Sequence, residues 1–186
     1  MHRQYCTLFV LAVCVAATLP SAARAGQGGI TQAPVAAAAS TVTSQRLKGV
    51  PDLDSVEDSV ASMINAERAS QGLPPLVVTS ELARLARSYS KAMVDHHFFD
   101  HRDPDGNMVR ARVERLGIEN WTELGENIAR NRGLQDPAQV AVREWMKSEG
   151  HRENILDARF KETGIGVWVA PDKTVYFTEI FLTRKH

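Results

Sequence analysis

The chain has very little cysteine: Cys6 and Cys14 are its two, and both lie in the N-terminal apolar stretch. From residue 26 onward there is none. This absence excludes a disulfide framework and a thiol nucleophile for everything that follows the apolar stretch. Any stability or chemistry must therefore come from packing, hydrogen bonds, charged groups or metal ligands.

An excess of charge of one sign is also missing, since 22 Lys and Arg residues balance 22 Asp and Glu residues. Removal of a signal over residues 1–25 would take away Arg3 and Arg24 and leave 20 basic against 22 acidic residues. The resulting net charge, near −2, argues against nucleic acid as a partner and against a polybasic membrane anchor.

Long hydrophobic runs are absent beyond the first 25 residues. The chain opens with a short positive segment, continues with a small and apolar run over residues 8–19, and reaches the A-x-A pattern Ala23-Arg24-Ala25. The run is too short to span a bilayer comfortably. We expect a signal peptide over residues 1–25 and a secreted or extracytoplasmic protein, in the periplasm or at the cell envelope. An uncleaved anchor and lipidation at Cys14 are the alternatives.

Residues 26–51 are rich in Gly, Ala, Ser and Thr and show no sustained period, which predicts a flexible linker. The remaining 135 residues, 52–186, are enough for one domain with its own core. Helical periodicity and start signals predict four helices there. They begin at the capping box Asp54-x-x-Glu57, after Thr79, near Met108 and at Asp136-Pro137, and they end near Gly72, His96, Gly117 and Gly150.

The C-terminal part changes period and predicts a hairpin of residues 164–169 and 174–182. Apolar side chains occupy both faces of its second strand, with Phe177 and Phe181 on one and Ile180 and Leu182 on the other. A sheet that is apolar on both sides needs cover on both sides. The expected fold class is therefore α+β: an α/β/α sandwich with a small antiparallel sheet between helices. Glu179 interrupts one apolar face, and we expect it in a salt bridge near a sheet edge.

Three polar residues spaced 25 apart, His101, Glu126 and His151, stand at expected ends or connections of helices, where folds place functional groups. Gly125 and Asn127 indicate that Glu126 lies in a constrained connection. Two imidazoles and a carboxylate form a set able to bind a divalent metal or a polar ligand, if the fold brings them together. Surface or helix-end roles are the alternatives for each residue alone.

No H-E-x-x-H or G-x-S-x-G motif supports a zincin or a serine hydrolase.

Six stretches in order across residues 55–182 resemble the CAP superfamily (cysteine-rich secretory proteins, antigen 5 and pathogenesis-related 1, or SCP domains) in its bacterial, cysteine-free form. The stretches are Asn65-x-x-Arg68, Phe98-Phe99-Asp100-His101 with Pro104-Asp105-Gly106, Gly125-Glu126-Asn127-Ile128-Ala129, Trp145-Met146-x-Ser148-x-Gly150-His151-Arg152-x-Asn154-Ile155-Leu156, Gly164-Ile165-Gly166-Val167 and Tyr176-x-Thr178-x-x-Phe181.

The resemblance implies an α/β/α sandwich with a cavity lined by two histidines and two glutamates, where some members bind zinc or another divalent ion. His101, His151 and Glu126 match three of these groups and are the expected metal ligands. Ser148 stands where many animal and plant members have the second glutamate, and Glu144 and Glu149 are the nearby candidates. The expected binding residues of the cavity are Glu126, Asn127 and Glu144.

Three functions are compatible with these residues. The first is an extracytoplasmic binding module whose cavity takes a divalent metal, a small ligand or a cell-envelope component. The second is a hydrolase in which a metal-bound water is the nucleophile and Glu126 the general base. The third is a lipid carrier, which needs an apolar groove. We expect the binding module, with no nucleic-acid partner and no transmembrane segment in the mature chain.

Overall fold

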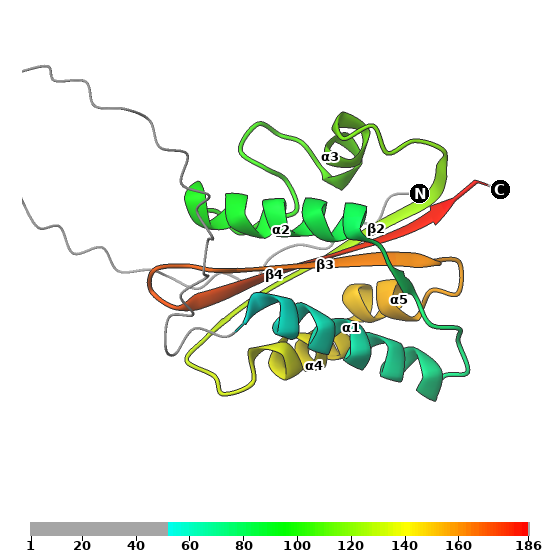
Figure 1. The fold of residues 1–186 in the computed structure, drawn as a ribbon, viewed down its shortest axis with the longest axis horizontal. Helices are drawn as coiled ribbons and strands as arrows, with labels where there is room; N and C mark the ends of the chain where they lie inside the picture. The colour runs from blue at the N-terminus through cyan, green and yellow to red at the C-terminus, as the bar shows by residue number, and fades with distance from the viewer. Residues whose placement is uncertain (1–51, 186) are drawn as a thin grey trace, which may run out of the picture. The chain divides into compact units, whose positions relative to one another are not determined.

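The computed structural model describes residues 52–185 (Figure 1). The signal peptide and linker predicted over residues 1–25 and 26–51 lie outside the described residues, as does His186. The elements in chain order are α1 (Leu53–Ser70), β1 (Val77–Val78), α2 (Ser80–Asp95), α3 (Val109–Arg115), β2 (Trp121–Arg132), α4 (Pro137–Lys147), α5 (Glu149–Leu156), β3 (Glu162–Val169) and β4 (Thr174–Arg184). Within residues 52–185, no helix combines the length and the apolar character needed to cross a membrane.

Four strands form one open sheet in the order β1-β3-β4-β2. β3 and β4 form the predicted antiparallel hairpin, and β2 pairs antiparallel with β4. The prediction of an antiparallel sheet is wrong at one edge, because the two-residue β1 runs parallel to β3. The N–H groups of Val77 and Thr79 donate to the carbonyls of Lys161 and Thr163, both over 2.9 Å. The sheet is therefore mixed.

Helices cover both faces of this sheet, which confirms the α/β/α sandwich. Figure 1 shows α2 and α3 on one face and α1, α4 and α5 on the other. On β4, Phe177 and Phe181 pack with the core that includes Trp145 of α4, while Ile180 and Leu182 pack with residues of α2 and α3. Side chains at alternate positions of β4 thus belong to two separate apolar cores.

Three of the four predicted helix starts are right, although α3, which begins at Val109, has no side-chain cap. Thr79 Oγ1 accepts from the N–H of Leu82 over 3.4 Å at the start of α2, and Asp136 Oδ1 accepts from the N–H of Gln139 over 2.9 Å at the start of α4. The capping box at Asp54 is wrong, because α1 already begins at Leu53. Glu57 turns inward instead and accepts from the N–H of Val167 over 2.9 Å.

Three elements were not predicted, β1, β2 and α5, and the last two carry site residues. The stretch around Glu126 was expected to be a connection, but residues 121–132 form the edge strand β2. His151 was expected just beyond the fourth helix but lies inside α5, which follows a break at Ser148 (φ −85°, ψ 122°). The alternation of polar and apolar residues that is typical of a strand is not visible in β2. Polar side chains occupy both of its faces, because they have partners on neighbouring elements.

Close packing of α2 on β3 determines the position of the loop that follows α2. A Cβ atom on Gly166 would lie 1.9 Å from the Arg87 backbone nitrogen, and one on Gly164 would lie 2.2 Å from the Leu82 carbonyl carbon. The missing side chains therefore let the helix backbone rest directly on the strand. This contact carries the C-terminal end of α2, and the segment that leads to His101, over the face of the sheet.

The motif Asn65-x-x-Arg68 serves the fold. Asn65 Oδ1 accepts from the N–H of Leu76 over 2.8 Å, which holds the chain leading to β1. Arg68 is fully buried, and its Nη1 donates to the carbonyls of Ile155 and Asp157 over 2.8 and 3.0 Å. This cation satisfies carbonyl groups at the C-terminal end of α5. α1 thereby fixes the helix that carries His151.

Glu179 does not lie near an edge and has no salt bridge with any residue that the structure describes, which corrects the prediction. It is fully buried on β4, between β3 and β2. Thr163 Oγ1 lies 3.2 Å from its Oε1, while Oε2 finds no partner among the described residues. Burial raises the pKa of Glu179 to about 8, against smaller opposing effects of the Thr163 hydrogen bond and the Arg68 charge. The carboxyl is therefore mostly protonated at pH 7.

Candidate functional site

Glu126 lies on β2 and points toward the side of the sheet that α2 and α3 cover. Its neighbours at alternate positions, Leu124 and Ile128, pack with residues of α2 and α3 on that side. The Glu126 side chain is only 3% exposed. His101 Nδ1 lies 2.9 Å from its Oε1, and Arg112 Nη2 is hydrogen-bonded to its Oε2. Both carboxylate oxygens therefore have partners.

Arg112 of α3 is the functional residue that the sequence analysis missed. Its Nη1 donates to the carbonyls of His101 and Asn107, each over 3.1 Å. The guanidinium also lies 3.4 Å from the centroid of the Tyr89 ring. Arg112 is 6% exposed, so it is a buried cation that compensates the buried charge of Glu126. Its position inside a predicted apolar helix face was the available signal, because a charge there needs a buried partner.

The contact with Glu126 decides the tautomer of His101. A carboxylate can only accept a hydrogen bond, so Nδ1 of His101 carries the hydrogen. Nε2 is then the nitrogen with a free lone pair. The His101 side chain is 38% exposed, so the ring is partly accessible to an incoming group.

His151 approaches His101 from the other side of the sheet edge. The two ring centroids lie 6.3 Å apart with an angle of 37° between the ring planes. Burial lowers the pKa of His151, and the neighbouring His101 lowers it further. His151 is therefore neutral at pH 7. The structure thus places two imidazoles side by side at β2, although they come from opposite layers of the sandwich.

Asn127 links β2 to α5 by hydrogen bonds inside the protein and does not lie in a turn. It is fully buried on the opposite face of β2 from Glu126. Its Nδ2 donates to the carbonyl of His151 over 3.2 Å, and its Oδ1 accepts from Asn154 Nδ2 over 2.9 Å. These bonds tie α5 to the strand. The predicted role of Asn127 in ligand binding stays a prediction, while its contacts show how His151 is positioned.

Gly125 is needed for close approach rather than for an unusual backbone angle, which corrects our expectation. It is absent from the positive-φ glycines, which are Gly72, Gly106, Gly117 and Gly133. A Cβ atom on Gly125 would lie 2.9 Å from Phe160 Cζ and 3.3 Å from Asn154 Oδ1. The missing side chain lets Phe160 and α5 pack directly against β2.

The second glutamate of the expected cavity has no counterpart in this cluster. Glu144 lies on the exposed side of α4, where it pairs with Arg143 over 3.3 Å and with Lys147 over 3.0 Å. Glu149 is exposed at the start of α5. Neither carboxylate takes part in the hydrogen bonds around Glu126.

A complete three-ligand metal site is not preformed. Within residues 52–185, no group of three or more His, Cys, Asp or Glu side chains is arranged to hold a metal ion. Glu126 instead contacts His101 and Arg112, as a carboxylate does when it orients a ligand rather than binding the ion. The three-ligand site therefore stays a prediction.

Comparison with known proteins identifies the family of this chain. A family model described as CAP, the cysteine-rich secretory protein family, matches residues 61–181. The curated relative YkwD of Bacillus subtilis strain 168, described as uncharacterized, is 37% identical over 144 residues, which is 77% of this chain and 53% of that protein. The chain therefore spans about half the length of this relative.

Two solved bacterial structures share the fold. One is an extracellular protein with an SCP domain from Bacillus anthracis, with a TM-score of 0.61, 28% identity and coverage of 71% of this chain and 41% of that chain. The other is a cysteine-rich secretory protein from Staphylococcus aureus, with a TM-score of 0.55, 25% identity and coverage of 72% and 40%. Because the family model matches well over half of its residues, this chain belongs to the cysteine-rich secretory protein (CAP) family.

Proposed function

We propose that this protein is an exported binding module in which His101 and His151 together bind a divalent metal ion. Glu126 serves as the orienting carboxylate behind His101. The observation that carries the proposal is the 2.9 Å contact between His101 Nδ1 and Glu126 Oε1, beside a second imidazole with its ring centroid 6.3 Å away.

The electronic state of both rings supports metal binding. A carboxylate that accepts from Nδ1–H raises the basicity of the ligating nitrogen and holds the ring in place. Metal binding also needs neutral imidazoles, and burial lowers the pKa of His151 in the required direction. One imidazole is thus oriented by a charge, while the other is kept neutral by its surroundings.

Two protein donors leave coordination positions for other groups. Zinc sites of catalytic or binding type keep at least one such open position, whereas structural sites are closed by four protein ligands. The His101 side chain is 38% exposed, so a small ligand with an oxygen or nitrogen donor has access to an ion bound there. This favours a binding module for a small ligand or a cell-envelope component over a structural metal site.

The hydrolase hypothesis finds less support in this geometry. A general base must reach the proton that it takes, within about 2.6–3.2 Å or through one water. Both oxygens of Glu126 are engaged by His101 and Arg112, and the side chain is 3% exposed. Glu126 is therefore placed to orient His101, not to accept a proton from a substrate or a water.

Export is the second part of the proposal. It is supported by the signal-like residues 1–25 and by the bacterial relatives described as extracellular or secretory. Expression of the full chain in its host, followed by fractionation and N-terminal sequencing, tests it. We expect a mature protein outside the cytoplasm that begins at Gly26; a full-length protein retained in the cytoplasm would contradict export.

Zinc titration of the purified protein tests the metal site. We expect the double variant His101→Ala, His151→Ala to lose measurable binding, and Glu126→Gln to bind roughly 10–100-fold more weakly, as for removal of an orienting carboxylate. The matched control is His96→Ala, His97→Ala, which removes two exposed histidines at the end of α2. Equal affinities for the two double variants would eliminate the site.

A further inference from the structure

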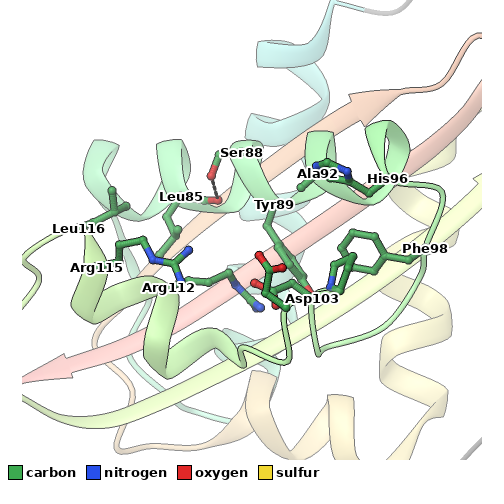
Figure 2. A pocket seen from close by; sticks show the side chains of 12 residues that line it. Leu85, Ser88, Tyr89, Ala92, His96, Phe98, Asp103, Arg112, Arg115 and Leu116 are labelled. Carbon is green, nitrogen blue, oxygen red and sulfur yellow. Dashed lines mark hydrogen bonds between the residues drawn. The ribbon is translucent and has the colours of Figure 1, made fainter.

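A separate cavity of about 330 Å³ lies between α2, α3 and the loop that joins them (Figure 2). Leu85 and Tyr89 of α2 form its floor and are 4% and 2% exposed. Phe98 closes one end and packs edge-on against Tyr89, with ring centroids 5.8 Å apart. A volume of this size is at the lower end of the range for small-molecule sites, about 300–1,000 Å³, which suits the apolar body of a small ligand.

The lining also holds hydrogen-bond donors without acceptors. Arg112 uses Nη1 and Nη2 for His101, Asn107 and Glu126, but its buried Nε–H has no partner among residues 52–185. Arg115, one turn further along α3, is exposed and forms no ion pair or hydrogen bond with any described residue. An unpaired buried donor is costly, so a ligand oxygen at this point would be favourable.

The acidic groups of the lining do not neutralise this end of the cavity. Asp103 accepts from the N–H of Asn107 over 2.7 Å and from its Nδ2 over 3.1 Å, and the cation that its charge acts on is Arg112 rather than Arg115. Asp105 is exposed to water, which screens its charge. Figure 2 shows Arg115 beside Leu116 at the Leu85 end of the cavity, with Phe98 at the other end. Arg115 therefore forms a positive end to a mostly apolar cavity.

We propose that this cavity binds a small amphipathic monoanion. Its apolar body lies against Leu85, Tyr89 and Phe98, and its carboxylate or sulfonate pairs with Arg115, with an oxygen within reach of the Arg112 Nε–H. This site differs from the proposed metal site, since the ligand does not touch His101 or His151. Arg112 is the one residue assigned to both sites, and it lies between them.

A matched pair of fluorescent probes tests both parts of the proposal. 8-Anilinonaphthalene-1-sulfonate carries the anion, and N-phenyl-1-naphthylamine has the same rings without it. We expect saturable binding of the anionic probe at one site per chain. The change Arg115→Glu weakens it by about tenfold or more, as for loss of a charge-assisted hydrogen bond. The change Arg84→Glu, on an exposed residue of α2 outside the cavity, leaves the affinity unchanged.

Two further variants identify the site. Ser88→Trp, at an exposed lining position of α2, fills the cavity and abolishes binding of both probes, while circular dichroism and the midpoint of urea unfolding show an intact fold. The double variant His101→Ala, His151→Ala binds the anionic probe as the wild type does, which separates this site from the metal site. Unchanged binding in Ser88→Trp overturns the location, and equal effects of Arg115→Glu and Arg84→Glu overturn the selection for an anion.

Discussion

His101 Nδ1 and Glu126 Oε1 lie 2.9 Å apart, although 25 residues separate them along the chain. Behind this contact, Arg112 donates to the carbonyl of His101 and pairs with Glu126. One buried cation therefore holds both the backbone of the histidine and the carboxylate that orients its ring. The imidazole is placed by a charge network inside the protein, while its other nitrogen takes no part in these hydrogen bonds.

Breaking this network should be strongly destabilising. The change Arg112→Met leaves Glu126 buried without its cation, which costs about 3–5 kcal/mol of unfolding free energy. The double variant Arg112→Met, Glu126→Leu removes both charges, and we expect it to be more stable than Arg112→Met alone. Urea unfolding of the four proteins in this double-mutant cycle measures the coupling. Additive effects of the two changes would show that the pair does not interact.

The stability of the protein should fall as pH rises from about 5 to 8, through Glu179. Its pKa is raised from 4.5 to about 8 in the folded protein, so between these values the folded state holds a proton that the unfolded state has lost. Stability from this group is fully present below the unfolded pKa and is lost as pH approaches 8. Each pH unit inside the window costs roughly 1.4 kcal/mol.

The change Glu179→Gln tests this, because the amide keeps the shape and the polarity of the protonated carboxyl without its titration. We expect the variant to gain stability relative to the wild type as pH rises from 5 to 8, measured by urea unfolding at several pH values. Glu119→Gln, at an exposed position, is the control and should keep the wild-type profile. Parallel curves for the wild type and Glu179→Gln would contradict the buried, protonated state.

The contact of α2 with β3 should tolerate no side chain at Gly166. A Cβ atom there would lie 1.9 Å from backbone, so Gly166→Ala forces the helix away and costs about 1–3 kcal/mol or more. Gly150→Ala is the matched control, because α5 has open space around that position. We expect it to leave stability unchanged or raise it by about 0.5 kcal/mol or less, because Gly150 lies in the first turn of α5 rather than in its interior. Thermal unfolding distinguishes the two, and similar melting temperatures would show that α2 adapts to the added methyl group.

Zinc affinity should drop as pH falls below about 6, because protons compete with the metal for the imidazole nitrogens. The lowered pKa of His151 keeps that ring neutral further down in pH than an ordinary histidine. Titrations between pH 5 and 8 at constant ionic strength measure this dependence. An affinity that does not change with pH would indicate binding by carboxylates elsewhere on the chain, and the proposed pair would then not be the metal site.

Local sequence signals were enough for much of the fold. The caps at Thr79 and Asp136, the apolar stripe of α2 and the two-faced strand β4 each act within a few residues, so they could be recognised without the rest of the chain. The capping box at Asp54 was a wrong prediction for the opposite reason, since the Glu57 carboxylate accepts a hydrogen bond from Val167, 110 residues away. A local motif does not form when a distant residue is the better hydrogen-bond partner for one of its side chains.

The sequence alone determined that His101, Glu126 and His151 belong together, because their residue types, their spacing and the family resemblance point to one cluster. Only the tertiary structure decided what Glu126 does there, since its role depends on Arg112, which reaches it from a different element. The same holds for the strand β2, whose polar side chains take their partners from α3 and α5, and for Glu179, which the sheet order places in the interior. Charge pairs and burial are relations between segments far apart in sequence, so they exist only once the layers have assembled.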